Sequence, residues 1–267
     1  QDSHTFAQWG IDYLKYDFCG PAADSSVAFQ RFRKMGEALQ KSGRNIAFGY
    51  SQSRNGNKED RQIDSLNKGL TQSNTRIDSF QQAHALQVNS INDGDIQSDL
   101  FEYSGPDSWY HPGNLLIGLN KNKLPADLNT GYTDTEYQSQ MSLWSMMAAP
   151  LIVAADIRKL DLLSKRILMN EEIIAINQDL MGKQAKRIIK DDNWSVFLKP
   201  LSNGDYAVAI LNHSEKTKNY SIKWSSLGLS DQFVIRDVWQ QQYIGKGRRW
   251  KGSVLSHEMR VFRLKGV

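Results

Sequence analysis

The sequence predicts an α/β domain built on parallel strands, followed by a small antiparallel β-sandwich. In the first half, short apolar strands alternate with an amphipathic helix, and the short connections between them are typical of a βαβ unit with parallel pairing. After about Gly182 the chain changes to short β-type segments separated by turn residues, a spacing that indicates a sandwich. We place the boundary at about residue 186, so residues 1–185 and 186–267 form the two predicted domains.

Composition is that of an ordinary globular protein. The 267 residues are 40% hydrophobic and 23% charged, with room for one large domain or a large and a small one. The net charge of +4 comes from scattered residues without a dense basic block, so we expect no nucleic-acid partner. No apolar run reaches the ~18–20 residues of a membrane span, so we expect no membrane partner.

Few residues of the chain are of the types that bind metals through nitrogen or sulfur. The single cysteine excludes an internal disulfide. The five histidines and this cysteine form no cluster with ligand spacing. We therefore expect no metal and no cofactor.

The most informative stretch is residues 9–20. It predicts a helix end, a glycine break and a short strand closed by a second glycine. Lys15 and Asp17 lie two residues apart, so both side chains leave the same face of an extended strand. Opposite charges at the end of a buried strand are costly unless they pair or serve a function. The residues alone leave both interpretations open, a structural ion pair or part of an active site.

Further strands and helices follow in alternation up to about residue 114. Apolar residues at helical spacing predict a helix over 25–42, and the polar stretch after it holds a possible short helix at 60–67. The loop at 104–114 is dense in turn residues and aromatics, a composition more common at binding sites than in plain connections. The other elements predicted here are strands at 45–52 and 75–78 and a helix at 79–88.

The second half contains the strongest local signal for a helix. Thr133 is the predicted N-cap of a helix over residues 133–148, and Glu136 completes a capping box. A strand at 150–155 and short helices at 161–169 and 171–177 come next. The predicted sandwich strands are 195–198, 206–211, 220–224, 233–237 and 259–264.

Three long and correctly spaced motifs resemble one known family. Residues 9–17 are similar to the strand-4 signature of that family, residues 136–158 to its last helix and strand, and residues 170–185 to its exit into a C-terminal domain. The family is glycoside hydrolase family 27, the α-galactosidases and α-N-acetylgalactosaminidases. The resemblance covers nearly the whole chain and implies a (β/α)8 TIM barrel, of which strands 4–8 are present, followed by a C-terminal antiparallel β-sandwich.

The resemblance implies a nucleophile at Asp17 and a contact to a substrate hydroxyl at Lys15. The chemistry agrees, since a retaining glycosidase needs two carboxyl groups roughly 5–5.5 Å apart, one ionised and one protonated. A lysine on the same face as Asp17 would hold that carboxylate in its ionised form.

The second carboxyl group is harder to assign. In the family the acid/base follows an arginine at the end of strand 6, and the best match is Asp78 after Arg76, although the spacing is shorter than usual. It needs a raised pKa and a position at a neighbouring strand end. Asp93, Asp95 and Asp99 are rivals, but their Asn-Asp-Gly-Asp setting is more typical of a solvated turn.

The resemblance implies three further pocket residues, Gln52 after strand 5, Arg76 at the end of strand 6 and Trp109 after strand 7. His111 replaces a polar residue of the family pattern, and it can either line the pocket or pack beside Trp109. The segments after strands 5 and 7 depart from the usual family pattern, and a lost carboxylate can change substrate preference. The expected carbohydrate substrate is therefore a terminal α-galactoside, with β-L-arabinopyranosides or isomaltose-type glucans as alternatives. A carbohydrate-binding homologue without turnover is the competing hypothesis.

By this register the chain begins just before strand 4. Five strands cannot close an eight-stranded barrel. We therefore expect strands 1–3 in an upstream segment or a second polypeptide. We also expect the protein to be secreted or periplasmic.

Overall fold

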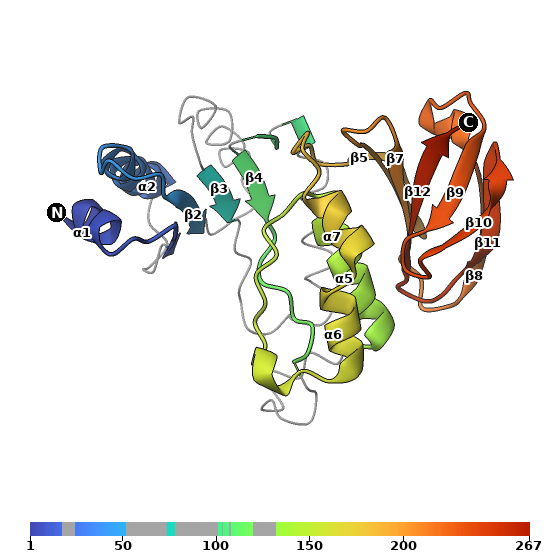
Figure 1. The fold of residues 1–267 in the computed structure, drawn as a ribbon, viewed down its shortest axis with the longest axis horizontal. Coiled ribbons are helices and arrows are strands. Elements are labelled where there is room, and N and C mark those ends of the chain that lie inside the picture. The colour runs from blue at the N-terminus through green and yellow to red at the C-terminus, as the bar shows by residue number, and fades with distance from the viewer. Residues whose placement is uncertain (18–24, 52–73, 78–100, 103, 107, 120–131) are drawn as a thin grey trace. The chain divides into compact units, whose positions relative to one another are not determined.

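The computed structural model describes residues 1–17, 25–51, 74–77, 101–102, 104–106, 108–119 and 132–267. The chain divides into two compact units (Figure 1). Residues 1–81 and 102–113 form the first, which we call the parallel-sheet unit. Residues 82–101 and 114–267 form the second, which we call the sandwich unit.

The parallel-sheet unit contains four adjacent parallel strands in the order β1-β2-β3-β4. Its elements are α1 (Asp2–Gln8), β1 (Tyr13–Asp17), α2 (Ser25–Gln40), β2 (Ala47–Ser51), β3 (Asn74–Ile77) and β4 (Ser108–His111). The parallel pairing predicted for the first strand–helix–strand unit is confirmed.

Helix α2 packs one apolar stripe against the sheet. Phe32 and Leu39 are buried in a cluster with Ile46 and Phe48. The ring of Tyr16 in β1 meets the ring of Phe32 edge-on, with centroids 6.0 Å apart. The face of β1 that carries Tyr16 is thus covered by α2, which leaves the alternate residues Lys15 and Asp17 for the opposite face.

The start of β1 is fixed by a turn and a distant arginine. Gly10 has φ +73°, a left-handed conformation that glycine adopts without strain. The Arg44 guanidinium donates hydrogen bonds to the carbonyls of Gly10 and Ile11, at 3.1 and 3.0 Å, and pairs with Asp12. These contacts hold the residues that lead into β1 against the segment before β2.

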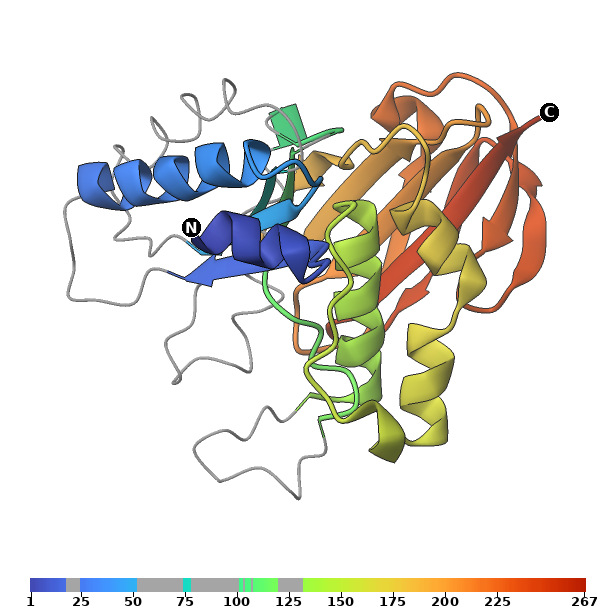
Figure 2. The same ribbon diagram turned by 60° about the vertical axis from the view of Figure 1, so that its left-hand side comes forward.

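The sandwich unit begins with helices and ends in two antiparallel sheets (Figure 2). The helices are α5 (Asp134–Met146), the 3₁₀ turn η4 (Ile157–Lys159), α6 (Leu162–Leu168) and α7 (Glu171–Asn177). The strands are β5 (Lys186–Lys190), β6 (Trp194–Pro200), β7 (Tyr206–Asn212), β8 (Lys218–Lys223), β9 (Phe233–Asp237), β10 (Gln242–Gly247), β11 (Arg249–Val254) and β12 (Met259–Gly266), with the 3₁₀ turn η5 (Trp224–Leu227). The six-stranded sheet has the order β10-β9-β12-β7-β6-β5, and β11 pairs with β8.

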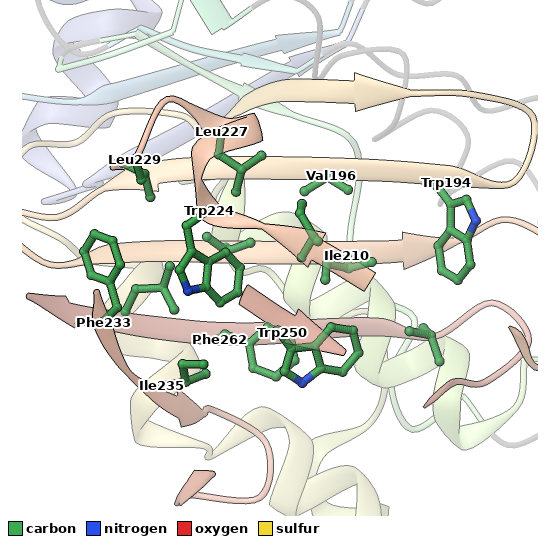
Figure 3. Packing of buried hydrophobic residues seen from close by; sticks show 14 residues of the cluster. Trp194, Val196, Ile210, Trp224, Leu227, Leu229, Phe233, Ile235, Trp250 and Phe262 are labelled. Atoms are coloured by element: carbon green, nitrogen blue, oxygen red, sulfur yellow. The ribbon is translucent and has the colours of Figure 1, made fainter. Parts of the chain in front are cut away.

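The sandwich core lies between these two sheets (Figure 3). Trp194, Trp224 and Trp250 are all buried in it. The Trp250 ring lies 4.8 Å from that of Phe262, between centroids. These three tryptophans are core residues of the sandwich.

Helix α5 starts at the predicted capping box. The Thr133 hydroxyl accepts a hydrogen bond from the Glu136 amide, and the Glu136 carboxylate accepts one from the Thr133 amide. From Ser139 to Met146 every residue is buried. The helix packs against α7 on one side and against β12 and β7 of the sandwich on another. Such a helix belongs to the interior of the unit and has no solvent face in its second half.

A buried lysine joins the helices to the sandwich. Lys199 of β6 is fully buried, and its ammonium donates to the carbonyls of Ser145 at 3.2 Å and Ile176 at 2.6 Å. Both carbonyls belong to the last turn of their helices, α5 and α7, where a cation is stabilised by the helix dipole. Burial lowers the pKa of Lys199 to about 8, against the opposing effect of the Asp179 carboxylate.

Two local predictions are corrected. The segment at 150–155 forms only an isolated parallel bridge, between Val153 and Leu115, and the Leu115 amide donates to the Ile152 carbonyl at 2.7 Å. The predicted loop at 104–114 contains β4, which the sequence did not show. Strands β5, β10 and β11 were not predicted either, and the predicted helices at 60–67 and 79–88 lie outside the described residues. Within the described part of the chain, no helix combines the length and apolar character that a membrane crossing requires.

Candidate active site

The carboxyl ends of the four parallel strands lie in register. Asp17 of β1 pairs with Ser51, Ser51 with Ile77, and Ile77 with His111 of β4. We call these four positions the strand-end row. In parallel α/β folds, residues at this end of the strands form the active-site floor. The row therefore brings Asp17 and His111 to the same edge of one sheet.

A second row lies two residues earlier along the strands. It joins Lys15 to Gly49, Gly49 to Thr75, and Thr75 to Trp109. Positions two apart on a strand share a face, so both rows belong to the face opposite Tyr16. Three of the predicted site positions, Lys15, Asp17 and Trp109, thus share a face with His111.

His111 has the most unusual environment of the described site residues. Its side chain is buried, and burial lowers its pKa to about 4, with a further lowering by the Lys15 charge and a small opposing effect of the Gly113 backbone. The imidazole is therefore neutral at pH 7 and offers one N–H donor and one acceptor nitrogen. Neither ring nitrogen has a well-formed hydrogen bond to the described residues.

An unsatisfied buried imidazole costs free energy, typically about 1–3 kcal/mol for the lost hydrogen bonds. Native structures leave few such groups, and those that exist concentrate at functional sites. At the same sheet edge as the Asp17 position, but three strands along the sheet from it, His111 can donate to or accept from a hydroxyl group of a bound molecule.

Lys15 supplies positive charge to the same place, since its ammonium lies close enough to lower the pKa of His111. Lys15 and Asp17 lie two positions apart on β1 and therefore share a face of the strand. The arrangement places a cation, the Asp17 position and a neutral hydrogen-bonding ring on one face of the sheet.

Some of the other predicted site residues lie in described strands, and others lie outside the described residues. Trp109 and His111 lie inside β4, and the prediction that Trp109 follows the strand is wrong. Arg76 pairs with Tyr50 and Tyr110 in the row between the two site rows, so its position shares the face of Tyr16 and not the face of Lys15, Asp17 and His111. Gln52 and Asp78 lie outside the described residues, as do the rival carboxylates Asp93, Asp95 and Asp99.

One position of the strand-end row was not singled out from the sequence. Ser51 is the last residue of β2, between Asp17 and Ile77 in the register. The signal available was its place at the end of a predicted strand, one residue before Gln52. Among the residues that the structure describes, no three His, Cys, Asp or Glu side chains are grouped as metal ligands.

Parallel strands that alternate with helices and lead into an antiparallel sandwich define a barrel-plus-sandwich protein. Residues 1–179 match the family model described as alpha galactosidase A. Residues 191–264 match the model described as alpha galactosidase C-terminal beta sandwich domain. The chain belongs to this family, glycoside hydrolase family 27, and its fold is the family's TIM barrel followed by a β-sandwich.

Curated relatives agree with the family assignment. An alpha-galactosidase of Oryza sativa subsp. japonica is 30% identical over 269 residues, which cover 99% of this chain and 59% of the relative. An alpha-galactosidase of Cyamopsis tetragonoloba is 34% identical over 242 residues, 90% of this chain and 54% of the relative. The chain thus spans somewhat more than half the length of these relatives.

Solved structures share the fold. Alpha-galactosidase I from Mortierella vinacea superposes with a TM-score of 0.81 at 24% identity, over 99% of this chain and 70% of that one. A β-L-arabinopyranosidase of family 27 from Geobacillus stearothermophilus, in complex with arabinose, gives 0.82 at 20% identity, over 99% of this chain and 61% of that one.

Proposed function

We propose that the protein is a retaining glycoside hydrolase that cleaves terminal α-galactosides, or a closely related glycoside, through a covalent glycosyl-enzyme intermediate. The observation that carries the proposal is the strand-end row, which brings the Asp17 position and the buried neutral His111 to one edge of the parallel sheet. Relatives that are named alpha-galactosidases support the substrate class.

In the proposed mechanism the Asp17 carboxylate attacks the anomeric carbon and forms an ester as the glycosidic C–O bond breaks. A protonated carboxyl group, for which Asp78 is the proposed residue, donates its proton to the leaving oxygen. In the second step this group takes a proton from water, which attacks the anomeric carbon and releases Asp17. Lys15 keeps Asp17 ionised between turnovers.

The remaining pocket residues would select the sugar. Trp109 lies two positions before His111 on β4 and offers an aromatic surface for a sugar ring. His111 would exchange a hydrogen bond with one hydroxyl group, and Gln52 is the other proposed contact. A site built to hydrogen-bond a hydroxyl rejects analogues that lack it, so these residues decide between galactosides, arabinopyranosides and glucosides.

Two further properties belong to the proposal. We propose that the remaining barrel strands come from an upstream segment or a second polypeptide, because an eight-stranded barrel closes only when all its strands pair. We also propose that the protein acts outside the cytoplasm, secreted or periplasmic, where polymeric glycosides are accessible.

Covalent trapping tests the proposal. The intact protein is incubated with 2-deoxy-2-fluoro glycosides or cyclitol epoxides of galacto, arabino and gluco configuration, and its mass is measured before peptide mapping. We expect one adduct on the peptide that contains Asp17, and the reactive configuration identifies the sugar. Asp17→Asn should form no adduct, whereas the exposed Asp12→Asn should react like the parent.

If the folded protein forms no adduct with any reagent yet binds galactosides equally well with Asp17 or Asn at position 17, the hydrolase is excluded. A carbohydrate-binding homologue without turnover then takes its place.

A further inference from the structure

The sandwich unit carries a strongly basic pocket far along the chain from the strand ends. The pocket has a volume of about 560 Å³. Its polar lining consists of Lys223, Lys246, Arg248 and Arg249 with the hydroxyl-bearing Ser225 and Ser230. We call it the cationic pocket. It is formed where β10 passes into β11, next to the end of β8 and the start of η5.

The four cations of this pocket differ from the other arginines of the sandwich in their ion pairing. Among the described residues, no carboxylate forms an ion pair with any of them. The same unit offers a contrast in a second hollow of about 740 Å³, where Arg236 pairs with Glu172 at 2.5 Å and Arg263 with Asp205 at 2.6 Å. Unpaired positive charge is therefore a property of the cationic pocket and not of every hollow on the sandwich.

The register brings two of the cations directly together. Arg249 of β11 and Lys223 of β8 are cross-strand partners. Like charges opposite each other on an antiparallel pair are destabilising. This repulsion between the two cations lowers the stability of the fold. A bound anion would offset the repulsion and so would be stabilised at this place.

The backbone of the pocket is fixed by a buried tryptophan. Trp224 lies between Lys223 and Ser225 and has no exposed surface. Its amide donates to the Arg248 carbonyl at 2.9 Å, and its indole N–H donates to the Gly247 carbonyl at 3.1 Å. These two bonds tie the two walls together, and the buried Leu229 lines the pocket beside them. The backbone that carries the exposed charged side chains is therefore fixed, which reduces the ordering cost of binding.

We propose that the cationic pocket binds the sulfate or carboxylate groups of an acidic polysaccharide. Two guanidinium groups can bind an oxyanion in bidentate geometry, and the two lysines add point charges around it. The choice of a saccharide as the carrier of the anion rests on the proposed function.

Binding by the intact protein to a sulfated galactan and to polygalacturonate, with neutral galactomannan as reference, tests the proposal. The variant Lys223→Gln/Lys246→Gln removes two pocket charges, and Lys216→Gln/Lys265→Gln removes two exposed lysines elsewhere on the sandwich. We expect the pocket variant to lose roughly tenfold in affinity for the acidic polymers, with a salt dependence lowered by about two charges. The control variant should bind like the parent, and both should keep the parental melting temperature.

Three results would overturn the proposal. Equal losses in both variants would mean that binding follows net charge alone. Unchanged affinity of the pocket variant for the acidic polymers would show that they do not bind at the cationic pocket. A single-stranded DNA oligomer that binds to the pocket as tightly as the polysaccharides would indicate a general polyanion surface.

Hydrolysis of an uncharged aryl α-galactoside is measured on the same samples, and the pocket variant should retain the parental rate. If the parent hydrolyses no glycoside but loses polymer binding only in the pocket variant, the proposed function fails and the anion site stands.

Discussion

Buried polar groups at two places in the molecule differ in their hydrogen bonding. At the junction between the helices and the sandwich, the Lys199 ammonium donates to two helix-end carbonyls. The Asn177 amide there likewise donates to the carbonyls of Trp144 and Ala149, at 3.3 and 2.9 Å. In the strand-end row, neither nitrogen of the buried His111 forms a well-formed hydrogen bond to the described residues. The polar groups at the junction contribute to stability, whereas we propose that His111 at the strand ends is available to a ligand.

The largest expected effect comes from Asp17→Asn. If the strand ends serve chemistry, this change removes the nucleophile and should lower kcat on the order of 10⁶-fold, as loss of a covalent nucleophile does elsewhere. The free energy of unfolding should stay within about 0.5 kcal/mol of the parent. Aryl glycoside kinetics and urea denaturation of the same preparation measure both quantities. A large loss of stability with little loss of rate would make Asp17 a structural residue. The strand-end row would then not differ from the junction in its role.

The next largest effect concerns the stability of the junction between the helices and the sandwich, and the substitution Lys199→Met tests it. This substitution leaves two buried helix-end carbonyls without their donor, so we expect the free energy of unfolding to fall by about 2–4 kcal/mol. Turnover per folded molecule should not change. Lys216→Met, at an exposed position, is the control and should have almost no effect on the urea midpoint. Parental stability in Lys199→Met would show that the two hydrogen bonds contribute nothing net.

The pH dependence of stability sharpens the comparison for His111. Its pKa in the folded protein is about 4, below the usual value of 6.5, so between these values the unfolded chain binds the proton that the folded chain does not. Stability from this residue is therefore complete above pH 6.5 and lost as the pH falls toward 4, a change of about 3 kcal/mol. Urea denaturation at pH 7 and pH 4.5 should show a smaller pH-dependent loss in His111→Gln than in the parent. If both proteins lost the same stability between pH 7 and pH 4.5, His111 would not be the neutral buried imidazole that makes the parent sensitive to pH.

The smallest expected effect concerns a single hydroxyl at the junction. The buried Ser139 of α5 donates to the His257 carbonyl at 2.7 Å and accepts from the Met259 amide at 2.8 Å. Ser139→Ala should cost about 1–2 kcal/mol of unfolding free energy without altering turnover. Ser226→Ala, which removes an exposed hydroxyl, provides the reference and should be close to neutral. If Ser226→Ala lost more unfolding free energy than Ser139→Ala, the hydrogen bonds at the junction would not be the source of the stability.

Elements with a strong local signal could be predicted from the sequence. The capping box of Thr133 and Glu136 is made by residues three apart, and it is present as predicted. The strand ending at Asp17 carries its own apolar residues and a preceding glycine, so its local pattern is sufficient.

Elements that depend on distant partners were missed. Strand β4 is four residues long and lies between Pro106 and Pro112, so turn residues mask it, and only pairing with β3 makes it extended. Strand β10 is exposed and contains Gly245, a sequence typical of a loop, yet it pairs with β9 as an edge strand. Non-local pairing of this kind overrides local preference.

The candidate site shows the same division. Lys15 and Asp17 were selected because their spacing on one strand is a local property. The burial of His111 and of Lys199 is decided by residues far away in the sequence, and a lysine in the pattern of β6 gives no sign that it will be enclosed. The register between four strands, which defines the strand-end row, is likewise invisible in any single segment.

The enclosure of α5 has a consequence for biosynthesis. Its last turns need strand β12 as a neighbour, and Met259 leaves the ribosome roughly 110 residues after Met146. At about 5–20 residues per second, the helix waits on the order of 10 s with apolar surface exposed. We expect chaperones to bind the exposed apolar surface during that interval, and we expect a product that ends before β12 to leave α5 without the strand that covers it.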